Sequence, residues 1–298
     1  MISTKHVYLG RLGIALALAL GLAGAGCKKK EQPAATGSGS GTGTGTGSGT
    51  AAAAAIDAPP APVNLITKAA TPQEAVDAAD RSAEDKALDA GRKPVELLTL
   101  LGVAEGQKVA ELFAGGGYTV ELLARVVGPT GTVYGQNPKK ILEMFAEKPW
   151  AARLARLASP TIVRVDRELA EPLPPEATNL DLVVMHLVYH DAVAMGVDRA
   201  AMNLAIWKAL KDGGHFAIID HSAKDGSGPN NAADLHRIEA AFVQSEVEQT
   251  GFILETKSDL FAHAEDTRDW STSPMAAADK RGTSDRFVLY FKKPVIIK

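Results

Sequence analysis

The stretch Val109-Ala-Glu-Leu-Phe-Ala-Gly-Gly-Gly-Tyr118 decides the fold, because a short apolar run with β character ends in three consecutive glycines. A helical pattern follows at once, with apolar residues at positions 120, 123, 124 and 127 on one face. Backbone without Cβ atoms at the end of a strand leaves room for a small ligand to lie against the main chain. The stretch therefore predicts a βα junction with a ligand site at its tip. A plain βα turn is the alternative.

Segments with strand character alternate with helical segments along the rest of the chain. After the glycines, strands are predicted over 131–137, 161–165, 180–187 and 215–219, and a closing pair over 252–259 and 286–292. Helices are predicted over 71–91, 94–101, 139–157, 202–210 and 233–250, the first of them opened by the capping box Thr71-Pro-Gln-Glu74. This alternation predicts an α/β fold with a Rossmann-like, seven-stranded, mostly parallel sheet, helices on both faces and an antiparallel C-terminal edge.

Residues 1–27 have the features of an export signal. Lys5 and Arg11 precede the apolar stretch 12–23, which is too short to span a bilayer but fits the core of a signal peptide. Small residues then lead to Cys27, the single cysteine of the 298-residue sequence, which argues against a disulfide framework. The segment resembles a bacterial lipoprotein signal, and this resemblance implies that Cys27 is lipidated. A signal peptide without lipidation is the alternative.

Residues 28–70 are rich in Gly, Ser, Thr, Ala and Pro, and include alternating glycine and hydroxyl residues from Gly37 to Thr50. Such a composition buries too little apolar surface to fold, so we expect a disordered linker between the signal (1–27) and a folded domain (71–298). The expected location is the cell envelope, lipid-anchored and facing the periplasm, with a secreted or periplasmic protein as the alternative. The net charge of −3 lacks the basic footprint of nucleic-acid binding. The oligomeric state stays open.

As a dinucleotide-binding fingerprint the glycine stretch fits poorly, because Phe113 occupies the place of the first glycine. The stretch resembles instead the first motif of the class I S-adenosylmethionine (SAM)-dependent methyltransferases. Other segments of that fold follow in the same order, at 179–184, 210–221, 251–254 and 285–289, so that the resemblance covers residues 75 to 295. The Gly-Gly-Gly-Tyr motif and the triplet Tyr189-His-Asp191 are most similar to a group of predicted methyltransferases.

The resemblance implies a SAM site beyond the carboxyl ends of the strands. The residues that it assigns to the cofactor are Glu111, Phe113, Ala114, Gly115, Gly116, Gly117, Asn137 and Asp166. Glu111 and the glycines would hold the methionine part of SAM, Asn137 the ribose and Asp166 the adenine amino group. Asn137 stands where the family has a carboxylate, and an amide accepts hydrogen bonds more weakly than an ionised group does.

Polar residues after the fourth and fifth strands are the candidates for catalysis: Tyr189, His190, Asp191, Asp220 and His221. We expect His190 to act as general base, with Tyr189 and Asp191 positioning it or the methyl acceptor. The histidine and aspartate residues of this set could hold a divalent ion. Half of these four side chains are imidazoles, however, whereas the catechol-type methyltransferases that hold a divalent ion use several hard oxygen ligands, so no metal is expected.

The leading hypothesis is SAM-dependent methylation of a small molecule at an oxygen or nitrogen atom. The competing hypothesis is a catalytically inactive module of the cell envelope with a methyltransferase-like fold, which Phe113 and Asn137 favour. Another nucleotide-dependent enzyme on the same architecture is the third. The expected partners are a small-molecule substrate and, through Cys27, the membrane, with no nucleic acid.

Overall fold

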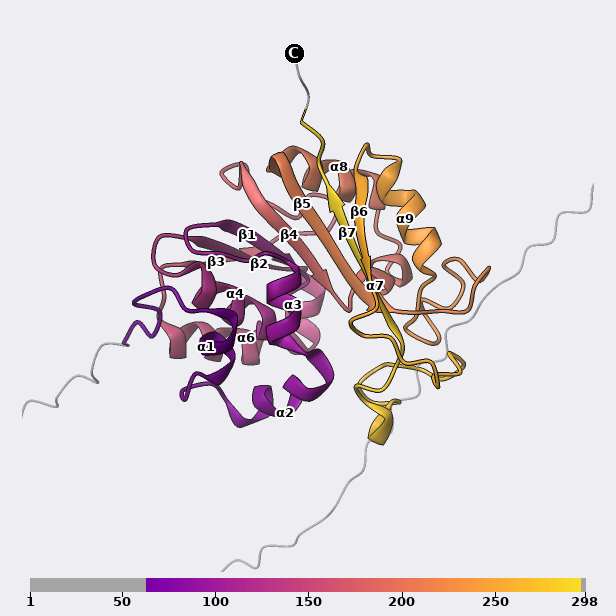
Figure 1. Ribbon diagram of the computed structural model, residues 1–298, viewed down its shortest axis with the longest axis horizontal. Helices are drawn as coiled ribbons and strands as arrows, with labels where there is room; N and C mark the ends of the chain where they lie inside the picture. The colour runs from indigo at the N-terminus through magenta and orange to yellow at the C-terminus, as the bar shows by residue number, and fades with distance from the viewer. Residues whose placement is uncertain (1–62, 296–298) are drawn as a thin grey trace, which may run out of the picture. The chain divides into compact units, whose positions relative to one another are not determined.

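Seven strands form one mixed sheet in the order β3-β2-β1-β4-β5-β7-β6 (Figure 1). They are β1 (Lys108–Leu112), β2 (Thr132–Asn137), β3 (Ile162–Asp166), β4 (Leu180–His186), β5 (Leu210–His221), β6 (Ile253–Ser258) and β7 (Arg286–Lys292). Strands β1 to β5 are parallel, whereas β7 is antiparallel to both β5 and β6. The computed structural model describes residues 63–295, and the predicted fold class is confirmed over them.

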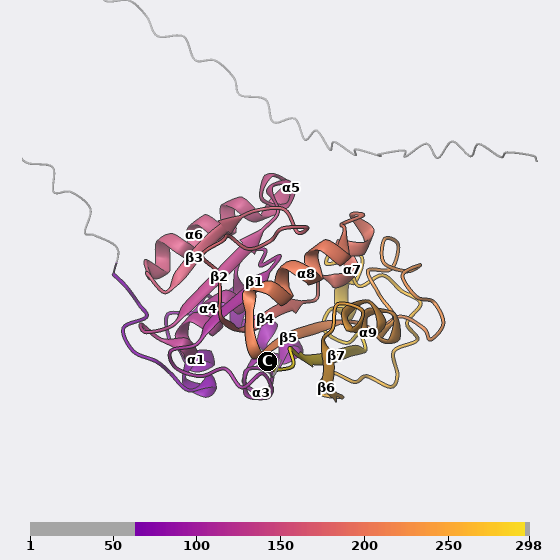
Figure 2. The same ribbon diagram turned by 90° about the horizontal axis from the view of Figure 1, so that it is seen from above.

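Helices cover both faces of this sheet. They are α1 (Pro72–Asp77), α2 (Ala83–Arg92), α3 (Pro94–Leu100), α4 (Tyr118–Val127), α5 (Lys139–Ile141), the π-helix η1 (Leu142–Ala146), α6 (Glu147–Leu157), α7 (Tyr189–Ala194), α8 (Arg199–Ala209), α9 (Ala240–Glu248) and the 3₁₀-helix η2 (Ala278–Lys280). In Figure 2, α1, α3 and α4 lie on one side of the sheet, and α8 and α9 on the other. The strand order reverses between β1 and β4, which is where open α/β sheets bind ligands.

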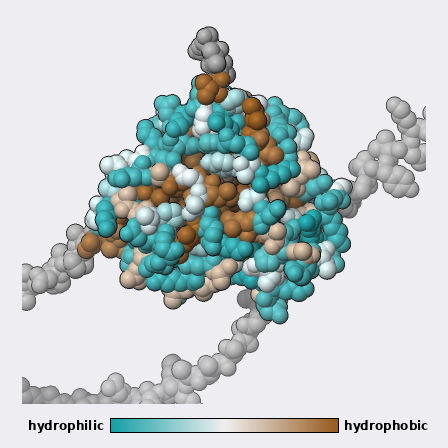
Figure 3. All heavy atoms as spheres, in the orientation of Figure 1, coloured by the Kyte–Doolittle hydropathy of each residue, from teal (hydrophilic) through white to brown (hydrophobic). Residues whose placement is uncertain are grey.

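The core includes one large aromatic side chain that requires glycine around it. Trp150 of α6 is fully buried, and a Cβ atom on Gly135 would lie 2.8 Å from its ring. A Cβ atom on Gly117 would lie at only 2.3 Å, so neither position accepts a larger residue without movement of the ring. At the surface, hydrophilic residues cover most of the face seen in Figure 3, and apolar residues gather near its centre, where Figure 1 shows α3 and β4.

Three predicted helices differ from the observed ones. The capping box at Thr71 is present, but the predicted helix over 71–91 is two helices, because the Ser82 side chain accepts a hydrogen bond from the backbone and caps α2 anew. The predicted helix over 139–157 contains the π-helical turn η1. The predicted helix over 233–250 is confirmed only for α9, since His236 has a φ of 51°, which an α-helix does not allow.

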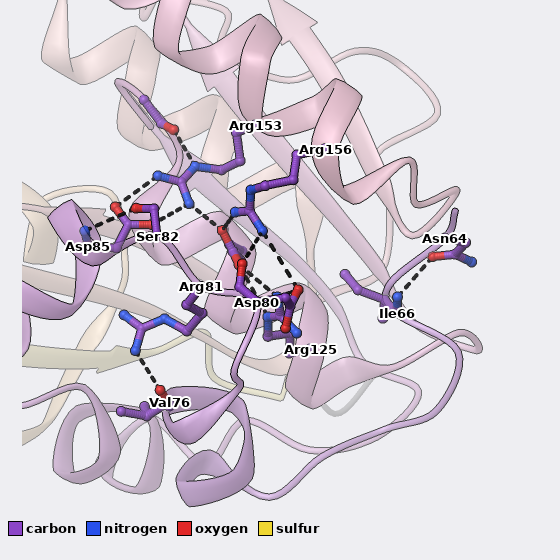
Figure 4. Close-up of polar contacts among 12 residues, drawn as sticks. Asn64, Ile66, Val76, Asp80, Arg81, Ser82, Asp85, Arg125, Arg153 and Arg156 are labelled. Atoms are coloured by element: carbon purple, nitrogen blue, oxygen red, sulfur yellow. Dashed lines mark hydrogen bonds and ion pairs between the residues drawn. The ribbon is translucent and has the colours of Figure 1, made fainter. Parts of the chain in front are cut away.

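A cluster of ion pairs joins the N-terminal helices to α4 and α6 (Figure 4). Asp80 lies 2.5 Å from Arg125, and Asp85 lies 2.6 Å from Arg153. The buried carboxylate of Glu121 pairs with both of these arginines and with Arg156. Since α2 contributes a carboxylate and α6 two arginines, this cluster holds α2 beside the segment that follows β1.

The packed part of the chain begins earlier than the sequence predicts. Ile66 is only 1% exposed, and the backbone of Leu65 and Ala70 is hydrogen-bonded to α6 and α4. The expectation that residues 63–70 belong to a disordered linker is therefore wrong. Residues 1–62, with the predicted signal, Cys27 and the rest of the linker, lie outside the described residues. Between residues 63 and 295, none of the helices combines the length and the apolar character that crossing a membrane requires.

Candidate functional site

The carboxyl ends of the parallel strands bring the predicted site residues to one edge of the sheet. The glycine loop (113–117) follows β1, Asn137 ends β2, and the His190 segment follows β4. Neighbouring strands lie about 4.8 Å apart, so the ends of β1 and β4 are within reach of one small ligand. The loops over 222–239 and 259–285 leave from the same edge, because β6 is parallel to β5.

The glycine loop turns sharply and leaves space on one side. Phe113 and Gly115 both have left-handed backbone, with φ of 59° and 56°. The Phe113 ring packs into the hydrophobic core, whereas a Cβ atom on Gly115 would meet no heavy atom of the described residues within 4 Å, its two chain neighbours aside. The space beside Gly115 is thus open and is not filled by Phe113.

Neighbouring elements hold the rest of this loop in place. The backbone N–H of Ala114 donates to the carbonyl of Gln136 at 2.8 Å, and Gly117 faces the buried ring on α6. The carbonyl of Gly116 accepts a hydrogen bond from Nε of Arg153 at 2.5 Å. The ion-pair cluster of Figure 4 therefore extends to the loop through Arg153.

Asn137 and Asp166 have protein partners in this structure. The Asn137 amide is fully buried and pairs with the backbone of Gly115: its oxygen accepts from the N–H at 2.8 Å, and its nitrogen donates to the carbonyl at 3.1 Å. Asp166 is exposed and pairs with Arg164 at 2.8 Å. The observed role of Asn137 is to fix the conformation of the glycine loop. Contact of these two residues with ribose and adenine stays a prediction.

Glu111 lies behind the loop among buried polar groups. Burial raises its pKa from 4.5 to about 7, although a hydrogen bond from Thr119 and the charge of Arg92 act in the opposite direction. Its Oε2 atom and Nε2 of His186 are buried without a hydrogen-bond partner among the described residues. Nδ1 of His186 lies 3.1 Å from the Thr119 hydroxyl. His186 thus points into the interior.

The pKa of Glu111 predicts how stability depends on pH. Because the folded-state pKa is about 7 and the ordinary value is 4.5, the unfolded state loses this proton first. Stability should therefore fall as the pH rises from 4.5 to 7, by about 3 kcal/mol at 1.36 kcal/mol per unit. Urea unfolding of the parent and Glu111→Gln at pH 5 and pH 8 would measure this. The difference in free energy of unfolding between Glu111→Gln and the parent should shift in favour of the variant by about that amount from pH 5 to pH 8. The same difference at both pH values would contradict the raised pKa of Glu111.

His190 is held by one buried carboxylate. Nδ1 of His190 lies 2.7 Å from Oδ1 of Asp220, and Oδ2 of Asp220 accepts from the His190 backbone at 2.8 Å. Asp220 also accepts from the backbone N–H of His221 at 2.7 Å. Since a carboxylate only accepts, Nδ1 of His190 carries the hydrogen, and Nε2 faces away from Asp220.

Nε2 of His190 faces two groups from different segments. Asp191 Oδ1 lies 3.4 Å from it, and Nδ1 of His236 lies 3.3 Å from it. Burial alone would lower the pKa of His190, but Asp220 and Asp191 outweigh burial and raise it to about 10. Burial would likewise raise the pKa of Asp191, but hydrogen bonds from His190 and His236 lower it. The two carboxylates therefore favour positive charge at this point of the site.

The other two candidate catalytic residues lie apart from this contact. Tyr189 is fully buried, and its hydroxyl donates to Glu246 of α9 at 3.1 Å. The ring of His221 lies 5.9 Å from that of His190, with Nδ1 bonded to the Ser284 hydroxyl at 2.8 Å. Burial, assisted by the nearby charge of His190, lowers the pKa of His221 well below its ordinary value. The structure thus brings His190, Asp191 and Asp220 together but not Tyr189.

Sequence analysis missed His236. It follows His190 by 46 residues and falls in a segment predicted as helix. His236 could have been identified as a candidate because it lies in the loop that follows β5. That loop leaves the sheet at the edge where the other polar candidate residues lie.

No protein-family model matches the chain. Solved structures do match it: a SAM-dependent methyltransferase from Aquifex aeolicus is 17% identical over 71% of this chain and 97% of that chain, with a TM-score of 0.50. A protein assigned as a methyltransferase, in complex with the Haloferax volcanii Trm112 methyltransferase activator, is 18% identical over 72% and 95%, with a TM-score of 0.50. A protein from Galdieria sulphuraria, assigned as a sarcosine dimethylglycine methyltransferase, is 16% identical over 72% and 88%, also with a TM-score of 0.50. At these identities the likeness concerns the fold alone, and this chain has the fold of SAM-dependent methyltransferases.

Proposed function

We propose that this protein is a class I SAM-dependent methyltransferase that acts on a small molecule at an oxygen or nitrogen atom. One observation carries the proposal: the backbone of Gly115 faces open space at the tip of β1, beside the point where the strand order reverses. In a sheet of this kind a ligand binds there. The fold shared with SAM-dependent methyltransferases suggests which ligand it is.

In this proposal SAM lies along the glycine loop and the ends of β1 and β2. The loop is already fixed by Asn137 and Arg153, so little conformational freedom is lost when the cofactor binds. The sulfonium methyl group is transferred in line to an acceptor atom. Much of the rate enhancement in such a reaction comes from holding the two reactants in the correct orientation.

The acceptor is proposed to lie beside the His190 cluster, which we define as His190, Asp191, Asp220 and His236. The cluster joins the ends of β4 and β5, within about 5 to 10 Å of β1 by strand spacing. The side chains of Asp191 and His236 are 27% and 33% exposed, whereas that of His190 is 3% exposed. Asp191 and His236 therefore meet the acceptor. His190 lies behind them and is the proposed general base, which acts through Nε2 in those molecules whose imidazole ring is neutral. Export and lipid anchoring through Cys27 remain part of the proposal.

Calorimetry with SAM and with its demethylated product tests this function. We expect micromolar binding by the parent, and equal binding by His190→Ala with turnover slowed by about 100-fold or more, because the base acts on the acceptor and not on the cofactor. A matched control is His215→Ala, which removes a histidine paired with Glu255 near the opposite edge of the sheet. If neither ligand bound the parent, a catalytically inactive binding module would be the better description.

A further inference from the structure

Three potential metal ligands meet at one point of the His190 cluster. Nε2 of His190, Nδ1 of His236 and Oδ1 of Asp191 form a triangle with sides of 3.3, 3.4 and 3.4 Å. In a tetrahedral zinc site with bonds of about 2.0 to 2.1 Å, any two ligand atoms lie about 3.3 to 3.4 Å apart. The three atoms are thus spaced as three corners of such a site.

The fourth member of the cluster, Asp220, is placed to hydrogen-bond to a metal ligand and not to the metal itself. A metal-bound histidine usually donates its other ring N–H to a carboxylate, which fixes the tautomer and the orientation of the ring. Asp220 accepts this hydrogen bond from Nδ1 of His190 at 2.7 Å, and its remaining contacts are backbone N–H groups. Nε2 of His190 therefore presents a lone pair to the centre of the triangle when the ring is neutral.

The backbone holds His236 in place for this contact. Its φ of 51° belongs to the left-handed region, which non-glycine residues adopt only where the surroundings impose it. The Thr272 hydroxyl donates to the His236 carbonyl at 2.7 Å, and the next residue, Arg237, is fully buried in an ion pair with Asp266. The residue is thus fixed by the 259–285 loop before any ligand arrives.

We propose that His190, Asp191 and His236 bind one divalent transition-metal ion, with Zn²⁺ as the best match. The ligand set of two imidazoles and one carboxylate suits zinc, iron and similar ions better than Mg²⁺ or Ca²⁺, which prefer oxygen. The carboxylates of Asp191 and Asp220 together balance the charge of a divalent ion. Three protein ligands leave a fourth position of the tetrahedron for a water molecule or a substrate atom, as in catalytic zinc sites.

This ligand set differs from the one that the sequence suggested. Asp220 and His221 follow β5, but Asp220 is the outer partner of His190, and His221 is bonded to Ser284 instead. His236 replaces them. The prediction that no metal binds was based on Asp220 and His221 and did not include the loop over 222–239, which contains His236.

The role of the ion rests on the proposed function, although its binding does not. The open position faces the acceptor side of the site, since Asp191 and His236 are the partly exposed members of the cluster. With the ion bound, Nε2 of His190 is a ligand and no longer a base. An acceptor oxygen or nitrogen atom at the open position would be oriented and would lose its proton more easily. The metal would then recruit acceptors that carry an ionisable group with a lone pair.

Metal binding by the purified full chain tests the inference. After dialysis against a chelator, calorimetry with Zn²⁺ alone should give one site per chain, and His236→Ala and Asp191→Ala should each weaken it by about 100-fold or more. Co²⁺ would serve as a spectroscopic probe, since a tetrahedral site gives strong visible absorption and an octahedral one does not. His215→Ala, which removes a histidine–carboxylate pair outside the cluster, should bind as the parent does.

The outcomes separate the site from the proposed function. The melting temperature of each metal-free variant reports whether it folds, and His236→Ala should fold, because its side chain is one-third exposed. Absence of binding by the folded parent, or binding that both cluster variants retain, would overturn the metal site. SAM binding without Zn²⁺ binding would refute the site and leave the methyltransferase proposal in place; the reverse result would refute only the proposed function.

Discussion

Gly115→Val is expected to abolish SAM binding while the domain stays folded. The position faces open space, so the Cβ of the added side chain meets no atom of residues 63–295 beyond its chain neighbours, and the side chain occupies the volume proposed for the cofactor. Its left-handed backbone adds about 1–2 kcal/mol of strain. We expect affinity to fall by at least about 100-fold, or roughly 2.7 kcal/mol, in calorimetry with the demethylated product.

Gly102→Val is the matched control. Gly102 also has a left-handed backbone, with φ of 62°, and a Cβ atom there would also meet nothing within 4 Å in the part of the chain that the structure describes, its chain neighbours aside. It precedes β1 and so lies toward the opposite edge of the sheet from the glycine loop. The two variants should lose similar stability, and only Gly115→Val should lose affinity. If both variants bound the demethylated product of SAM with equal affinity, the proposed position of the cofactor would be wrong.

Asp266→Ala is expected to cause the largest loss of stability. Its carboxylate and the Arg237 guanidinium are both fully buried, 2.8 Å apart, and it also accepts hydrogen bonds from Trp270 and the backbone of Asp285. Removing one partner of a buried pair leaves an uncompensated charge, and the free energy of unfolding should fall by about 3–5 kcal/mol in urea. Because Arg237 follows His236, the His190 cluster should loosen as well.

An exposed pair provides the comparison for this prediction. Glu147 and Arg164 lie 2.5 Å apart, but the carboxylate is half exposed. Glu147→Ala should lower the free energy of unfolding by less than about 1 kcal/mol, since solvent screens the pair. If Asp266→Ala lowered the free energy of unfolding as little as Glu147→Ala does, the loops over 222–239 and 259–285 would not depend on the buried pair.

The sheet was predictable from sequence because each strand carries its own signal. Buried parallel strands such as β4 are short apolar runs between polar turns, and the closing pair, β6 and β7, has no α-helix between its members. The divided helix over 71–91 and the shortened one over 233–250 depended on contacts that local patterns do not contain. A cap at Ser82 competes with helix continuation, and the position of His236 is imposed by Thr272 and Arg237.

The candidate site was predictable only in outline. The glycine loop and the residues after β4 and β5 could be placed, because parallel strands end at one edge. Which atoms are in contact there could not be predicted, because side-chain contacts depend on the tertiary structure and not on the local sequence pattern. Asn137 pairs with the backbone of Gly115, and Tyr189 turns toward Glu246. His236 joins His190 from a loop whose path depends on the 259–285 segment.

The position of β7 between β5 and β6 has a consequence for biosynthesis. The ribosome makes β5 and β6 before the strand that separates them, so the emerging chain carries two edges that cannot yet be joined in the native order. Unpaired edges of this kind invite pairing with other chains until they are covered. The last strand thus completes the sheet. Until residues 286–292 have left the exit tunnel, the nascent domain remains accessible to chaperones and prone to misassembly.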